Sequence, residues 1–216
     1  IVGGGEDGKG AVTGVELEDG SILEADLVVM GIGAGAPLGP FEKLDSTPER
    51  FPGGIKTDAN FRASGEGVAE GSVYAIGDIA AFPLAMEEGK LVRMEHVDHA
   101  RKSATHAALH MLTGADTPYD YLPYFYSRNF EHAGSDRKVA WVFHGLQKGE
   151  VIVVGDFNPK LAAFWVEGGK LMGVMLESGT PEECGALPGA ARAQKAVDVN
   201  ALKAAATVED ALALLG

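Results

Sequence analysis

The second half of the chain constrains the fold most, because short β-like runs recur there between glycine turns. Turn signals such as Gly145, Gly149 and Gly155-Asp156 separate runs rich in aromatic and β-branched residues. Five such runs follow one another, at 124–130, 139–143, 151–154, 163–166 and 171–176. Short strands at this spacing predict an antiparallel sheet.

Helical segments flank these runs. Residues 96–112 are rich in alanine and free of proline, and Thr113-Gly114 follows where a glycine commonly ends a helix. After the last run, Thr180-Pro181-Glu182-Glu183 has the order of an N-cap, a first-turn proline and acidic first-turn residues. The remainder is rich in alanine and leucine, which predicts helix to the end. A linker at 118–123 places a boundary near residue 117.

The first third of the chain contains shorter signals. Residues 27–30 are continuously apolar, which predicts a strand buried on both faces, as in a parallel sheet. They lead into the glycine-rich segment 31–35, which can be a ligand loop or a plain turn. Asp19-Gly20 lies between two β-like runs and predicts a hairpin. Residues 72–76 predict a short strand that ends at Gly77-Asp78.

The glycines at positions 3–5 do not continue into the dinucleotide fingerprint. That fingerprint needs a strand and then Gly-x-Gly-x-x-Gly at the start of a helix. Here the glycines are followed by Glu6-Asp7-Gly8 and then by the alternating pattern of a strand. We therefore expect a surface turn rather than a phosphate site at these residues.

Charge and cysteine content exclude several classes of function. The 216 residues include 31 Asp and Glu against 18 Lys and Arg, a net charge of −13. This argues against nucleic acid or an anionic membrane as the main partner, and no apolar run approaches the ~20 residues of a bilayer span. Cys184 is the one cysteine, so an internal disulfide and a Cys-x-x-Cys pair within this chain are excluded. The first residue is Ile1, and we expect a piece of a longer protein.

Four segments together resemble a known family. They are Leu-Val-Val-Met-Gly-Ile-Gly at 27–33, Val-Tyr-Ala-Ile-Gly-Asp-Ile-Ala-Ala-Phe-Pro at 73–83, Glu-His-Val-Asp-His-Ala-Arg-Lys-Ser at 95–103 and Tyr-Asp-Tyr-Leu-Pro-Tyr-Phe-Tyr-Ser-Arg at 119–128. In this order they resemble the C-terminal half of the plant-type monodehydroascorbate reductases. Members of that family are FAD- and NADH-dependent flavoprotein reductases with two dinucleotide-binding domains.

The resemblance implies a fold of α/β plus α+β class with three parts. Residues 1–45 would end the NAD-binding domain, and 46–116 would be the C-terminal part of the FAD-binding domain. Residues 117–216 would form a C-terminal interface domain with an antiparallel sheet and helices. The first FAD-binding segment and most of the NAD-binding domain would lie upstream.

The resemblance also implies cofactor-binding residues. It assigns FAD to Gly77, Asp78 and Val97, where the Asp78 carboxylate would accept a hydrogen bond from the ribityl chain. Val97 begins the long predicted helix, where the helix dipole and unpaired N–H groups favour the negative charge of a reduced flavin. Nicotinamide contacts are implied at Glu95 and His96. The alternative for Asp78 is an ordinary turn or helix cap.

Three further residues follow from the same resemblance. Gly33 would lie near NAD, and Tyr126 would lie beside flavin and nicotinamide as a catalytic residue. Arg101 would hold the anionic substrate, because a planar guanidinium suits enolate oxygens in an otherwise acidic protein. The alternatives are a core or interface tyrosine at Tyr126 and a solvated helix-surface arginine at Arg101.

The predicted helix at 96–112 carries histidines whose spacing also has to be considered. His99, His106 and His110 fall on one face. His99 and His106 are two turns, about 10 Å, apart, which is too far to share one ion. A polar helix face is the better interpretation, and we expect no metal site. Cys184 is interpreted as structural.

The function expected from the resemblance is electron transfer from NADH through FAD to the monodehydroascorbate radical, a small-molecule substrate, which regenerates ascorbate. The alternatives are a ferredoxin- or rubredoxin-type flavin reductase and a non-catalytic binding module. The 216 residues alone are expected to be inactive. A cytoplasmic location is expected, with a chloroplast or another organelle as the alternative if a transit peptide lies upstream.

Overall fold

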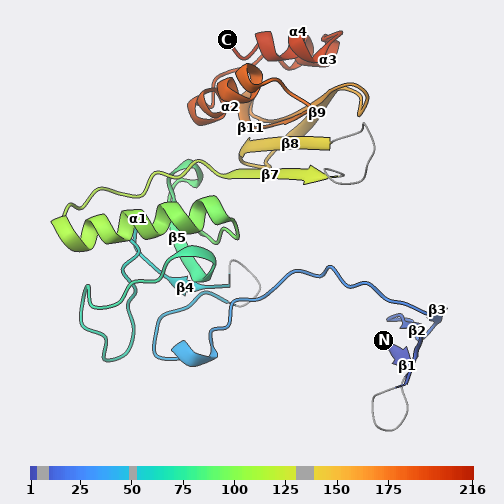
Figure 1. Ribbon diagram of the computed structural model, residues 1–216. Coiled ribbons are helices and arrows are strands. Elements are labelled where there is room, and N and C mark those ends of the chain that lie inside the picture. Colours follow the sequence, from blue (N-terminus) through green and yellow to red (C-terminus); the bar gives the residue numbers. More distant parts are fainter. Residues whose placement is uncertain (4–9, 49–52, 130–138) are drawn as a thin grey trace. The chain divides into compact units, whose positions relative to one another are not determined.

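The computed structural model describes residues 1–3, 10–48, 53–129 and 139–216. The chain forms two compact units, Ile1–Gly35 and Ala36–Gly216 (Figure 1). The surface turn predicted at the first glycines falls mostly on residues 4 and 5, which lie outside the described residues.

The first unit contains a small antiparallel sheet. Its strands are β1 (Val2–Gly3), β2 (Val12–Glu16) and β3 (Ile22–Glu24), in the order β1-β2-β3. Glu16 pairs with Ile22 across the turn, and the Asp19 carboxylate accepts a hydrogen bond from the Ser21 backbone N–H at 2.9 Å. Gly20 has a φ of +83°, which glycine adopts without strain. The hairpin predicted at Asp19-Gly20 is confirmed.

The strand predicted at 27–30 is wrong. Residues 27–38 have no regular secondary structure, and the side chains of Leu27 and Val29 are 80% and 86% exposed. A strand is buried on both faces only inside a sheet whose two faces are covered by other elements. Within the described part of the first unit, the sheet has three strands and 27–30 pairs with none of them.

The second unit begins with a small mixed sheet. It contains β4 (Ile55–Lys56), β5 (Ala80–Leu84) and β6 (Lys90–Val92), with β4 parallel and β6 antiparallel to β5. Short 3₁₀ helices are η1 (Gly39–Phe41), η2 (Gly77–Ile79) and η3 (Ala85–Glu87). The strand predicted at 72–76 is wrong, because only Tyr74 pairs there, through an isolated bridge to Arg62.

Helix α1 (Val97–Thr113) packs on the core of this region. Gly114 ends it in the left-handed conformation, with φ +66°, and donates its N–H to the His110 carbonyl at 2.8 Å. This confirms the helix predicted at 96–112 and its glycine cap. Beneath the helix, the Phe82 ring stacks on the His99 ring with centroids 4.7 Å apart.

The five predicted β-runs form one antiparallel sheet, as expected. Its strands are β7 (Tyr124–Asn129), β8 (Val139–Gly145), β9 (Glu150–Gly155), β10 (Leu161–Glu167) and β11 (Lys170–Glu177). Their order is β7-β8-β11-β10-β9, so β7 and β9 are the edge strands. Glycine is required at Gly145, which has a φ of +98° and where a Cβ would lie 2.3 Å from the Met172 carbonyl oxygen.

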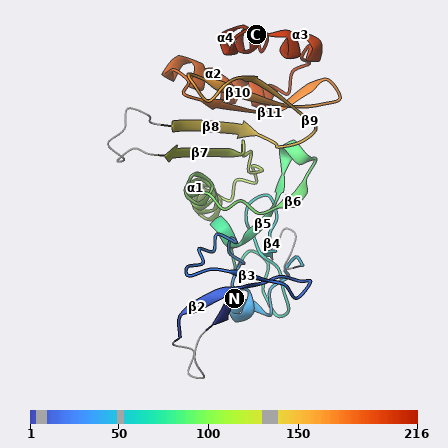
Figure 2. The same cartoon turned by 90° about the vertical axis from the view of Figure 1, so that its right-hand side faces the viewer.

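Three helices cover one face of this sheet (Figures 1 and 2). They are α2 (Pro181–Ala193), α3 (Val199–Ala204) and α4 (Val208–Ala213). Phe164 and Leu176 of the sheet, fully buried, share a core with Leu187 and Leu202 of the helices. Within the described residues, every helix is too short or too polar to cross a bilayer.

The start of α2 has the predicted cap. The Thr180 hydroxyl accepts from the Glu183 N–H, and the Glu183 carboxylate accepts from the Thr180 N–H, a full capping box. The helix expected to continue to the end is instead three helices. Gln194 ends α2 in a left-handed conformation, and the Asp198 carboxylate then caps α3.

Phe82→Ala tests the core beneath α1. Removing this fully buried ring should lower the free energy of unfolding by about 3–5 kcal/mol. The substitution leaves a cavity and removes the contacts of the ring with Phe61 and His99. Urea denaturation followed by circular dichroism measures the change. Phe157→Ala, at a ring that is 61% exposed, is the matched control, with a change within about 0.5 kcal/mol. Equal losses in the two variants would contradict this packing.

Candidate functional site

The N-terminus of α1 is capped by a histidine. His96 has an extended backbone, and its Nδ1 atom accepts a hydrogen bond from the Asp98 N–H at 3.2 Å. In a neutral His96 ring the proton therefore resides on Nε2. Asp98, in the first turn, pairs with Lys102 one turn further on at 2.8 Å. The N-terminus of a helix attracts anions, and the negative charge of Asp98 opposes that attraction. Lys102 offsets this negative charge.

The Gly77-Asp78 turn is attached to the same helix. Gly77 lies in η2 with a φ of +67°, and its N–H donates to the buried Ser103 hydroxyl of α1 at 3.0 Å. A Cβ at Gly77 would contact Ala100 at 3.5 Å. The turn therefore presents the exposed carboxylate of Asp78 close to the helix surface.

Arg93 connects this turn to Glu95. Its Nη1 atom donates to the Asp78 carbonyl oxygen at 3.0 Å and pairs with Glu95 Oε1 at 2.5 Å. The Arg93 side chain is only 15% exposed, whereas that of Glu95 is 45% exposed. The sequence motifs do not predict a role for Arg93. The one feature of the sequence that could have drawn attention to it is its place two residues before Glu95.

Aromatic rings of strand β7 surround His96. The centroid of the His96 ring lies 5.4 Å from that of Tyr124, 5.2 Å from that of Phe125 and 5.7 Å from that of Tyr126. Tyr126 stays 42% exposed and Val97 49% exposed. The start of α1 and the edge strand β7 thus meet at a partly open apolar surface.

A cavity of about 380 Å³ opens beside this surface. Glu95, His96 and Tyr121 are among the residues that line it. Phe125, Trp141 and Phe143 of the five-stranded sheet complete the apolar wall. Aromatic walls with a few polar groups are typical of sites for planar cofactors.

Arg101 follows Val97 by one helical turn and is exposed. It lines a different cavity, of about 410 Å³, together with Lys102, His106 and Asp120. The structure therefore places Arg101 near the helix start but in a cavity that Glu95 and His96 do not line. Gly33 belongs to the first unit, with a φ of +76° and open space around its Cα.

The residues present fit a flavin at the α1 start. Gly77 forms a turn that a side chain would strain, Asp78 presents an exposed acceptor, and Val97 and Tyr126 leave apolar surface uncovered. A hydroxylated chain could bond to the carboxylate while a flat ring covers the apolar surface.

The histidine face of α1 is occupied by protein contacts. His99 Nδ1 lies 3.4 Å from the Tyr119 hydroxyl, His106 Nε2 3.0 Å from Asn60 Oδ1, and His110 Nδ1 2.9 Å from the Tyr74 hydroxyl. Within the described ranges, no three His, Cys, Asp or Glu side chains lie together as metal ligands would. Burial raises the pKa of the Cys184 thiol, so it is less readily ionised.

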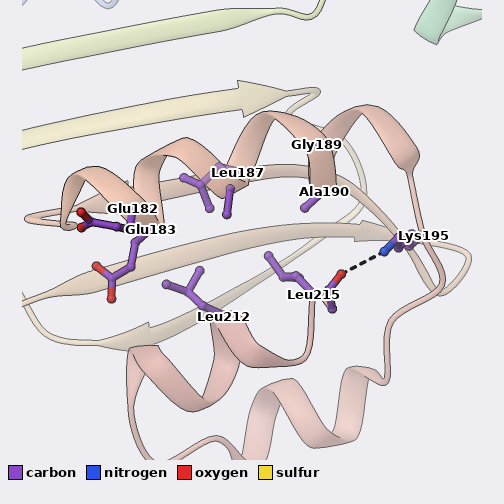
Figure 3. A pocket seen from close by; sticks show the side chains of 10 residues that line it. Glu182, Glu183, Leu187, Gly189, Ala190, Lys195, Leu212 and Leu215 are labelled. Carbon is purple, nitrogen blue, oxygen red and sulfur yellow. Dashed lines mark hydrogen bonds between the residues drawn. The ribbon is translucent and has the colours of Figure 1, made fainter.

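A larger cavity, of about 600 Å³, lies between α2 and α4 (Figure 3). Its middle is lined by Leu187, Leu212 and Leu215. Lys195, at one end, donates to the Gly216 carbonyl at 3.0 Å. None of the residues predicted from the sequence to bind cofactor or substrate lines this cavity, so its size alone does not make it the candidate site.

Comparisons with known proteins identify the chain. Residues 122–209 match the family model "Monodehydroascorbate reductase 3-like, C-terminal domain", and residues 2–104 match the model "Pyridine nucleotide-disulphide oxidoreductase". A relative from Arabidopsis thaliana, "Monodehydroascorbate reductase, chloroplastic/mitochondrial", is 51% identical over 96% of this chain and 40% of its own length. Over nearly all of its length, the chain is similar to monodehydroascorbate reductases. The resemblance predicted from its motifs is confirmed.

A second curated relative and a solved structure are also similar to the chain. "Monodehydroascorbate reductase 5, chlorplastic" from Oryza sativa subsp. japonica is 51% identical over 96% of this chain and 40% of its own length. A ferredoxin reductase of Rhodopseudomonas palustris, for the CYP199A2 system, superimposes with a TM-score of 0.69 at 29% identity, over 95% of this chain and 46% of that one. The chain thus spans about 40% of the length of the curated relatives it matches. The predicted fold class, that of a flavoprotein reductase, is confirmed.

The pH dependence of stability tests the burial of the His99 side chain. Burial lowers the pKa of His99 to about 4, against the opposing attraction of Asp78. Between pH 6.5 and about 4 the unfolded chain therefore binds more protons, and the free energy of unfolding should fall as the pH falls through this window. Urea denaturation at a series of pH values measures this slope.

His99→Gln is the informative variant for that series. It should flatten the slope without abolishing it, because burial also lowers the pKa of His144 to about 4. If the slope in His99→Gln were as steep as in the parent, the lowered pKa of His99 would not be the cause of the pH dependence.

Proposed function

We propose that this chain supplies the flavin- and substrate-facing part of an enzyme that transfers electrons from NADH through FAD to the monodehydroascorbate radical. One observation carries the proposal. The Gly77-Asp78 turn, the start of α1 and the exposed ring of Tyr126 converge through contacts of Ser103, Arg93 and His96. The names of the relatives at 51% identity support the substrate.

The residues of the turn and the helix start hold the cofactor in this proposal. The Asp78 carboxylate accepts a hydrogen bond from the ribityl chain of FAD. Val97, as the first residue of α1, directs the positive end of the helix dipole at the edge where a reduced flavin carries negative charge. Bound FAD supplies the conversion of a two-electron donor into one-electron steps.

Glu95, His96 and Tyr126 face the nicotinamide in this proposal. Glu95 and His96 line one wall of the 380 Å³ cavity, and the Tyr126 ring contacts the His96 ring. These side chains orient the nicotinamide and exclude water. Gly33 contributes to NAD binding from the glycine-rich segment 31–35.

Arg101 holds the anionic substrate in this proposal. It is an exposed cation one turn from Val97, in a chain of net charge −13. A local cation focuses the field on an anion that the rest of the molecule repels. The guanidinium presents paired donors to enolate oxygens.

The domain division and the location are part of the same proposal. Residues 1–45 complete an NAD-binding domain, 46–116 an FAD-binding domain, and 117–216 a C-terminal domain beside the flavin. The two relatives at 51% identity are named as organelle proteins, which favours the organelle alternative over the cytoplasm.

A ferredoxin-type reductase is the second candidate, because the ferredoxin reductase of Rhodopseudomonas palustris has a TM-score of 0.69. Steady-state rates of the full gene product with a generated ascorbate radical, ferricyanide and a small iron–sulfur protein separate the candidates. Our proposal predicts fastest turnover with the radical. Turnover of the radical no faster than of ferricyanide would contradict it, and a preference for the iron–sulfur protein would favour the second candidate.

The 216 residues alone should bind FAD weakly or not at all, because the family's first FAD-binding segment is expected upstream. Equilibrium dialysis with FAD measures this binding. A yellow protein with one flavin per chain after purification would contradict this prediction.

Arg101→Ala in the full gene product should raise the KM for the radical about tenfold, as expected for loss of a charged hydrogen bond. Reduction of the flavin by NADH should stay within about twofold of the parent. Stopped-flow absorbance and steady-state rates measure the two steps.

Lys203→Ala is the matched control for Arg101→Ala. It removes an equal charge from α3, where Lys203 pairs with Glu150. It should leave both steps unchanged. An equal slowing of flavin reduction in Arg101→Ala would contradict a substrate-specific role.

A further inference from the structure

Arg93 contacts both its near neighbour Glu95 and the Asp78 turn, which lies 15 residues earlier in the chain. It stands in the connection between β6 and α1, yet its Nη1 atom donates to the carbonyl oxygen of Asp78. The same atom pairs with the carboxylate of Glu95. Nη1 carries two N–H groups, so one nitrogen can serve both partners.

The backbone leaves room for this side chain. A Cβ at Gly54 would lie 3.1 Å from Arg93 Cδ and 2.6 Å from the Ile79 carbonyl oxygen. Gly54 is itself buried. The absence of a side chain there therefore lets the Arg93 stem pass beside the strands to reach the Asp78 turn.

The side chains of Arg93 and Glu95 differ in how far they are exposed to solvent. The Arg93 side chain is largely buried, at 15% exposed, while the Glu95 side chain is 45% exposed at the rim of the 380 Å³ cavity. A largely buried guanidinium with fixed partners holds its geometry better than an exposed ion pair does. The positive charge of Arg93 also offsets the Glu95 carboxylate, which would otherwise repel the phosphates of a dinucleotide.

We propose that Arg93 is a positioning residue that couples the flavin-side turn at Asp78 to the nicotinamide-side carboxylate of Glu95. This rests on the proposed function. Through the pair, Glu95 is held at one orientation relative to the turn that contacts the flavin. NADH binding therefore depends on Arg93, whereas electron transfer from the flavin to the radical does not.

Arg93→Lys in the full gene product is the first test. A lysine keeps the charge, but its Nζ ends one bond short of the position of Nη1 and its N–H groups are not fixed in a plane, so it cannot hold both partners in the same geometry. The Kd for NADH in stopped-flow flavin reduction should rise about tenfold. Oxidation of the reduced flavin by the radical should stay within about twofold of the parent.

Arg62→Lys is the matched control. Arg62 has two acidic partners, Asp58 at 2.5 Å and Asp116 at 3.7 Å, and it lines another cavity. Its conservative variant should change neither half-reaction. This separates the position of Arg93 from a general effect of replacing a paired arginine.

Glu95→Gln tests the same coupling from the other partner, and it keeps the proposal testable if Arg93→Lys does not fold. Glu95 is half exposed, and its variant should give the same selective rise in the Kd for NADH. Adding Arg93→Lys to Glu95→Gln should then raise that Kd less than twofold further, because the two residues act as a unit. Independent, multiplying effects in the double variant would contradict the coupling.

The outcomes separate this proposal from the proposed function. A parent that reduces its flavin with NADH but does not turn over the radical contradicts the proposed substrate and leaves Arg93 testable by NADH binding. An Arg93→Lys variant with unchanged NADH binding, or with both half-reactions slowed equally, overturns the positioning role. A parent without bound flavin overturns both.

Discussion

The contact between the Gly77-Asp78 turn and α1 determines where the other groups of the candidate site lie. The hydrogen bond from Gly77 to the buried Ser103 hydroxyl attaches the turn to the helix, and the stacking of Phe82 on His99 fixes the helix above β5. Once the helix is fixed, its first turn and its cap face the edge strand β7. The position of every proposed cofactor contact in the second unit follows from this packing.

Polar groups at the helix start are arranged so that few charges are left unbalanced. Asp98 is paired with Lys102, and Glu95 with Arg93. In a chain with a net charge of −13, these pairs offset carboxylates beside groups proposed to bind three anionic ligands, which are FAD, NADH and an organic radical anion. Arg101 then provides a further cation on the exposed face of α1. The local field therefore differs from that expected from the overall composition.

The sequence predicts much of this fold but not all of the site. The five-stranded sheet and α1 are predictable because glycine turns and helix caps are local signals. The strand at 27–30 is mispredicted because an apolar run does not reveal whether neighbouring strands exist. Asp78 and the helix start come from the family resemblance, and the structure brings them together. Arg93 is not predictable, since its role depends on segments around 54, 78 and 95 meeting in space.

Hydrogen exchange with mass spectrometry tests the central convergence most directly. The full gene product, stripped of flavin and then reloaded, is compared in both states. Our account predicts that FAD slows exchange together at 76–79, at 96–98 and along β7, and leaves α3 and α4 unchanged. Slowed exchange confined to the cleft between α2 and α4, or slowed exchange at only one of the three segments, would contradict it.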